Sequence, residues 1–93
     1  MSTSTFYAFS CDTPNADLRM VIEYGLEVTA QRTKCRPIAV HMHPNLIRRY
    51  IAVHGDWPSH WPKLIENDAM SQTLIGIEPG VIDANGFQQQ RLI

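Results

Sequence analysis

The stretch ADLRMVIEYGLEVTAQRTKCRPIAVHMH, residues 16–43, decides the fold of this chain. From Ala16 to about Lys34 its apolar residues follow helical spacing. Pro37 ends the predicted helix, because the residue before a proline is kept out of the α region. Ile38–His43 then alternates as a strand. The apolar face of the predicted helix consists of Leu18, Val21, Ile22, Gly25, Leu26, Val28 and Thr29.

Segments on either side continue the alternation of strands and helices. The aromatic and apolar residues of Thr5–Ser10 predict a short strand before the first helix. Pro44 and Asn45 begin a second helix, and Gly55 marks its end. Residues 56–63 contain two Trp-Pro pairs and predict an ordered loop, because proline is excluded from the interior of a helix. The apolar stripe of the second helix consists of Leu46, Ile47, Tyr50 and Ile51.

The last third of the chain predicts a further strand followed by a hairpin. Leu64–Met70 suits one or two helical turns, and Thr73–Ile77 suits a strand. A hairpin is predicted around Asn85-Gly86, between strands at residues 81–84 and 87–90. The order is therefore β-α-β-α-loop-β-β in a single domain spanning residues 1–93. This order predicts an α+β fold with its helices packed on one face of a short sheet.

Composition narrows the classes of function. The chain has 93 residues, of which 44% are hydrophobic and 18% charged, and its net charge is −1. This balance excludes a disordered protein and does not favour binding to nucleic acid or to a membrane. Between Val28 and Gly55 every charged residue is basic, whereas acidic residues predominate from Asp56 onward. Such a dipolar chain suits a charged partner or self-association, although ordinary solvated faces produce the same pattern.

The two cysteines suggest a reducing compartment. Residues 1–10 lack the basic and apolar regions of a secretory leader, and no apolar run is long enough to span a membrane. We therefore expect Cys11 and Cys35 to be reduced thiols and the protein to be cytoplasmic.

The four histidines are candidate metal ligands. His41 and His43 lie two residues apart on the predicted strand and would face the same side. With His54 and His60 they could supply three or four ligands to Zn²⁺, and Asp56 or Glu66 could serve as a base. Other roles suit the same residues: His43 as a helix cap, His54 as a core residue and His60 as a stacking partner for tryptophan.

The loop repeats the pattern W-P-x-x-W-P. Trp57 and Trp61 would form a large amphipathic surface, and tryptophan is enriched at binding hot spots. Arg48 and Arg49, opposite the apolar stripe of the second helix, would add a charged face for a partner. The alternative is that both indoles cover the domain's own core. No nucleophile motif such as G-x-S-x-G occurs in the sequence, so an enzyme is the less favoured class.

Two segments resemble a known family. RPIAVHMHPNL at residues 36–46 and LIGIEPGVI at residues 74–82 resemble the central domain of tailed-phage major capsid proteins. There, a strand ending in Met-x-Pro opens a helix, and a later Leu-x-Gly-Ile segment forms the next strand. The chain lacks the long arm, the extended loop and the spine helix of such shells. The resemblance therefore implies a small virion or phage-accessory protein, found in the virion or the host cytoplasm.

Three hypotheses about function follow from these patterns. The leading one is a non-enzymatic interaction or assembly module, which binds a protein partner or its own copies through the Trp-Pro loop and the charged faces. It needs no cofactor. The second is a histidine metal-binding protein, structural or hydrolytic. The third is a phage-encoded inhibitor of a host defence complex.

Overall fold

The computed structural model describes residues 7–11 and 17–80, and its elements follow the order β-α-β-α-β-β. Neither helix in the described residues is long and apolar enough to cross a bilayer. The elements are β1 (Tyr7–Ser10), α1 (Leu18–Thr33), β2 (Pro37–Met42), α2 (Pro44–His54), β3 (Lys63–Glu66) and β4 (Leu74–Pro79).

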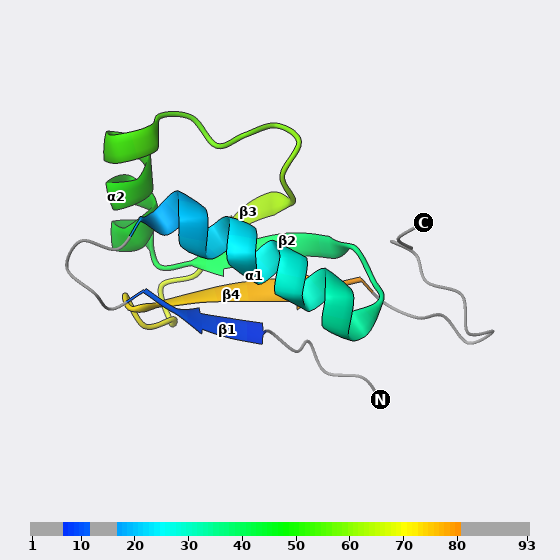
Figure 1. The fold of residues 1–93 in the computed structure, drawn as a ribbon. Helices are drawn as coiled ribbons and strands as arrows, with labels where there is room; N and C mark the ends of the chain where they lie inside the picture. Colours follow the sequence, from blue (N-terminus) through cyan, green and yellow to red (C-terminus); the bar gives the residue numbers. More distant parts are fainter. Residues whose placement is uncertain (1–6, 12–16, 81–93) are drawn as a thin grey trace.

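The four strands form one mixed sheet in the order β1-β4-β2-β3. β4 is antiparallel to both of its neighbours, whereas β2 and β3 are parallel. Val40 on β2 lies opposite Ile77 on β4 and Leu64 on β3, which places these three side chains on the same face. Figure 1 shows α1 lying along the sheet and α2 standing at one end of it.

One hydrophobic cluster joins both helices to this face of the sheet. Ile22 of α1, Tyr50 of α2 and Ile77 of β4 are all buried within it. Because side chains from both helices meet the same strand face, the helices cover one side of the sheet, and the predicted α+β fold is confirmed. The buried members of the cluster are Cys11, Leu18, Ile22, Val40, Met42, Leu46, Tyr50, Ile75 and Ile77.

Local chemistry fixes the ends of both helices. The Asp17 side chain accepts a hydrogen bond from the Met20 backbone N–H and caps α1, which ends at Lys34 in the left-handed region (φ 60°). α2 begins at Pro44, whose fixed φ and missing N–H suit the first helical position. It ends at Gly55, whose φ of 82° favours glycine.

The prediction of helical turns over Leu64–Met70 was wrong. Lys63–Glu66 instead forms β3, which pairs in parallel with residues 39–42 of β2. A four-residue segment has weak intrinsic preference, and pairing with a strand that would otherwise be an edge overrides it. The predicted hairpin at residues 81–90 lies outside the described residues.

Gly25 lets α1 approach the sheet closely. A Cβ atom built at this position would lie 3.0 Å from the Phe9 ring and 3.2 Å from Ile77 Cγ1. We expect Gly25→Ala to lower the free energy of unfolding by about 1 kcal/mol. The added methyl group would press against the side chains of Phe9 and Ile77, and this overpacking outweighs the gain in helix propensity. Urea denaturation measures the change. Combining it with Phe9→Leu should recover most of the loss, and a stabilised single variant would contradict the prediction.

Candidate functional site

The segment between α2 and β3, residues 55–62, is an ordered loop with both tryptophans packed together. Their ring centroids lie 4.9 Å apart in an edge-to-face arrangement. The Trp57 Nε1–H donates to the Pro62 carbonyl oxygen at 2.9 Å, and the Trp61 backbone N–H donates to the Pro58 carbonyl oxygen at 3.2 Å. These bonds close the loop on itself, and the first of them also holds the Trp57 indole in place. We call this segment the tryptophan loop.

Both indoles rest on the core through Tyr50. The Tyr50 ring centroid lies 5.4 Å from that of Trp57 and 6.1 Å from that of Trp61. Each tryptophan is half-buried and packs against the hydrophobic cluster. The Arg19 guanidinium lies 5.7 Å from the centroid of the Trp61 ring, within the range of a cation–π contact. The indoles therefore cover part of the core, as one of the two predictions had it, and retain partial exposure.

A groove opens beside the tryptophan loop. It has a volume of about 370 Å³ and lies between α1, the start of β2 and the loop. β2 begins at Pro37, but its pairing with β3 begins only at Ala39. Within the described part of the chain, no strand therefore lies beside Pro37 and Ile38 on the β3 side, and the groove occupies this gap. Its lining consists of Leu26, Arg36, Pro37, Ile38, His60, Trp61 and Pro62.

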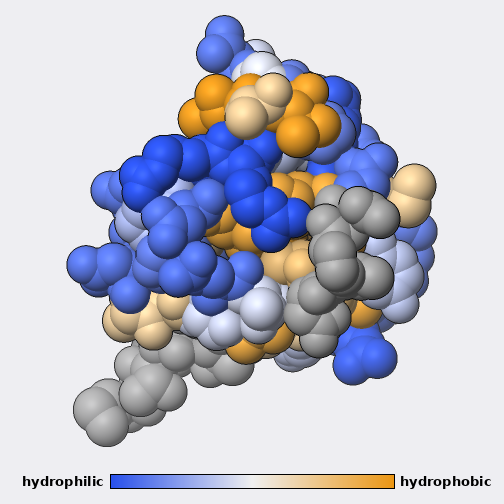
Figure 2. Space-filling view, turned by 90° about the vertical axis from the view of Figure 1, so that its left-hand side faces the viewer, coloured by the Kyte–Doolittle hydropathy of each residue, from blue (hydrophilic) through white to orange (hydrophobic). Residues whose placement is uncertain are grey.

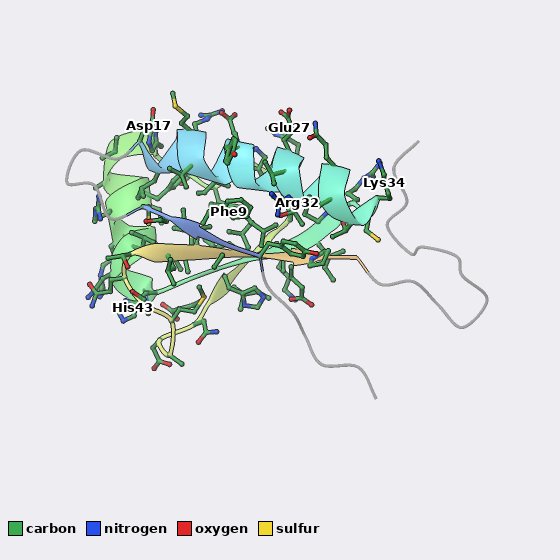
Figure 3. The ribbon with its side chains drawn as sticks, turned by 60° about the horizontal axis from the view of Figure 1, so that its bottom comes forward. Phe9, Asp17, Glu27, Arg32, Lys34 and His43 are labelled. Atoms are coloured by element: carbon green, nitrogen blue, oxygen red, sulfur yellow. The ribbon has the colours of Figure 1, made fainter. Side chains whose placement is uncertain are left out.

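The charge around this groove is basic. Arg36 and His60 are exposed lining residues, and none of the lining residues is acidic. Arg32 and Lys34 precede Arg36 in the chain and are also exposed. Figure 3 shows them at the C-terminal end of α1, far from His43 at the other end of the molecule. The groove thus combines an apolar wall with positive charge.

Arg48 and Arg49 do not line the groove. Both are exposed on α2, which follows the other end of β2, and the Arg48 Nη2 donates to Asn45 Oδ1 at 2.6 Å. On the same helix, the side chains of Ile51 and Val53 are 48% and 76% exposed. Figure 2 faces this end of the molecule and shows hydrophobic residues gathered at its top among hydrophilic ones. The prediction that Arg48 and Arg49 bind a partner stays a prediction.

The four histidines lie in four different environments. His41 Nε2 lies 2.8 Å from Glu78 Oε1, on the strand face away from the helices. His43 Nδ1 accepts a hydrogen bond from the Asn45 backbone N–H at 3.0 Å and caps α2. The remaining two contact other groups: His54 Nε2 lies 3.3 Å from Asp17 Oδ1, and the His60 ring lies 6.4 Å from that of Trp61.

The structure corrects the predicted position of His43, whereas the metal-binding hypothesis stays a prediction. β2 ends at Met42, so His43 belongs to the start of α2, and its ring accepts a hydrogen bond from the backbone of that helix. Among residues 7–11 and 17–80, no group of three or more His, Cys, Asp or Glu side chains is placed to hold a metal ion. The alternative roles for His43 as a helix cap and for His60 as a neighbour of tryptophan are those seen in the structure.

A second hollow, about 340 Å³ in volume, lies between α1 and β1. Met20 and Tyr24 line it and are each 64% exposed, while the Phe9 ring meets the Tyr24 ring edge to face at 6.0 Å. None of its lining residues is charged. Tyr24 therefore provides an exposed aromatic residue remote from the tryptophan loop.

No protein-family model, curated protein or solved structure matches the chain. The resemblance to the central domain of capsid proteins stays a prediction.

Proposed function

We propose that this protein is an interaction module that binds a segment of a partner protein in the groove beside the tryptophan loop. The observation that carries the proposal is the position of Trp61. Its indole is held by Trp57 on one side and lies under Arg19, yet it forms the wall of an open groove together with Leu26. A rigid aromatic side chain at the edge of a pocket loses little entropy on binding, which is typical of a binding hot spot.

The size of the groove supports a segment as the ligand. A volume of about 370 Å³ falls at the low end of the range for ligand pockets, roughly 300–1,000 Å³. It accommodates a few side chains and is too small for a folded surface. Self-association through the same groove is the alternative outcome, and the oligomeric state of the purified protein distinguishes the two.

Replacing Trp61 with Ala tests the proposal. We expect the wild-type chain to retain a stoichiometric protein partner from its native source at about 0.15 M salt, where weak surface contacts are screened. Trp61→Ala should bind that partner with an affinity at least about 30-fold lower, the effect of removing a hot-spot tryptophan. Tyr24→Ala, which removes an exposed aromatic ring that lines the other hollow beside α1, is the control and should retain it.

Circular dichroism of each variant establishes that the fold persists. Equal retention by Trp61→Ala and the wild type would exclude the groove as the binding site, and a wild-type chain that retains nothing would overturn the interaction function itself.

A further inference from the structure

Resting on the proposed function, we infer that the groove takes an extended partner segment in which an apolar side chain adjoins a carboxylate. The apolar part of this inference comes from the walls. Leu26, Ile38 and Trp61 present aliphatic and aromatic surface to the same space, with Pro37 and Pro62 beside them. A leucine or phenylalanine side chain placed there would leave water for apolar surroundings, which is the main favourable term in such binding.

The extended conformation follows from the edge of β2. Pro37 and Ile38 lie beyond the last residue pairing with β3, so the described strands leave this edge of the sheet uncovered. A peptide that enters beside a free strand edge aligns with it in extended form and places alternate side chains toward one face. Those side chains would point into the groove toward Leu26 and Trp61.

The acidic part follows from charge. Arg36 lines the groove and is exposed, so its guanidinium is available to bind a carboxylate with two parallel hydrogen bonds. Arg32 and Lys34, on the same end of α1, add positive potential.

None of the acidic side chains on the neighbouring elements lines the groove. Glu23 of α1 pairs with Arg19 at 3.8 Å, and Asp56 is exposed at the start of the tryptophan loop. Two others are engaged by hydrogen bonds. Glu27 follows Leu26 on α1 and accepts a hydrogen bond from Gln31 Nε2 at 3.4 Å. Glu78 lies opposite Ala39 of β2 and is joined to His41 at 2.8 Å. Lys63, the residue after Pro62, is exposed and adds a further positive charge next to the loop. A ligand that complements the positive charge around the groove therefore carries a negative charge.

The test uses synthetic peptides as probes. Each carries one Leu or Phe in a Gly/Ser background, flanked by Glu, by Gln or by Lys, and its binding is followed by fluorescence polarisation of a terminal label. We expect the Glu peptides to bind at least about tenfold more tightly than their Gln counterparts, the difference that one charge-assisted hydrogen bond makes. Their affinity should fall as salt is raised, because the pairing charges are exposed.

A charge exchange at Arg36 completes the test. Arg36→Glu should lose affinity for the Glu peptides and gain affinity for the Lys peptides. Arg36→Lys should retain part of the affinity for the Glu peptides. Gln72→Glu, which adds a negative charge beside Asn45 at the start of α2 and away from the groove, is the control and should change neither.

The outcomes separate this inference from the proposed function. Equal binding of Glu and Gln peptides, or no effect of Arg36→Glu on any of them, would overturn the acidic specificity. The interaction function would survive if the native partner still depended on Trp61. Phenylacetate that bound as tightly as the peptides would also overturn the inference, because the ligand would then be a small carboxylate. Failure of the Trp61→Ala test would remove both proposals together.

Discussion

Tyr50→Ala is expected to lower the free energy of unfolding by about 3–5 kcal/mol, the usual cost of truncating a buried aromatic side chain. Tyr50 is 1% exposed and its ring is in contact with three other rings, those of His54, Trp57 and Trp61. Its removal would leave a cavity between α2 and the tryptophan loop. A loss of this size is a large part of the roughly 5–15 kcal/mol that holds a domain folded. Urea denaturation followed by circular dichroism measures it.

Tyr50→Phe is the matched control, and it should not destabilise the protein. The Tyr50 hydroxyl is buried and has no hydrogen-bond partner among the described residues. An unsatisfied buried hydroxyl costs about 1–3 kcal/mol, so its deletion should leave stability unchanged or raised. A phenylalanine variant that unfolded more easily than the wild type would show that the hydroxyl makes a stabilising contact, for example with a bound water molecule.

The same pair of proteins should differ at alkaline pH. Burial raises the pKa of the Tyr50 phenol above its ordinary value of 10.0; Arg19 opposes this, whereas Glu23 and Asp17 reinforce it. Between the two pKa values the unfolded chain has lost the proton and the folded chain retains it, so stability falls as pH rises. Relative to Tyr50→Phe, the wild type should keep its full stability below about pH 10 and lose stability as the pH rises above that value.

Much of the fold was predictable because its signals are local. The helical spacing of Leu18 and Ile22 matches their burial in α1, and Pro44 correctly marked the start of α2. β3 was not predictable in the same way. Lys63–Glu66 is too short to show a clear alternation, and it is a strand because β2 offers it an edge, which is a property of the assembled sheet.

The sequence predicted only some of the residues of the candidate site. The W-P-x-x-W-P pattern pointed to Trp57 and Trp61. Leu26, Arg36 and Ile38 line the same groove only because β3 pairs with β2 from Ala39 onward and leaves the first two residues of β2 unpaired on that side. That register is non-local. The position of His43, by contrast, is predictable from the sequence: the same Pro44 that opens α2 also ends β2 at Met42, before His43.

Trp57→Ala is the second change from which we expect a large effect, a loss of about 3–5 kcal/mol in the free energy of unfolding. It removes an indole that packs on Tyr50 and donates a hydrogen bond to the Pro62 carbonyl oxygen, so both the core contact and the closure of the loop are lost. Trp61→Ala should cost less, because that ring lies farther from Tyr50, at 6.1 Å against 5.4 Å for Trp57, and forms the wall of the groove. Trp57→Phe, which keeps an aromatic ring but removes the hydrogen bond, should fall between Trp57→Ala and the wild type.

The two tryptophans would thereby be assigned different roles. If Trp57 supports the loop and Trp61 contacts the partner, Trp57→Ala weakens binding in proportion to the fraction of chain that is unfolded, and stabilising conditions restore it. Trp61→Ala weakens binding in a chain that is still folded, and stabilising conditions do not help. Osmolyte titration of both variants, read by circular dichroism and by retention of the partner, distinguishes these cases. Equal stability losses for both variants would mean that the indoles act as one core unit, and the role of Trp61 in the groove would then need evidence from peptide binding alone.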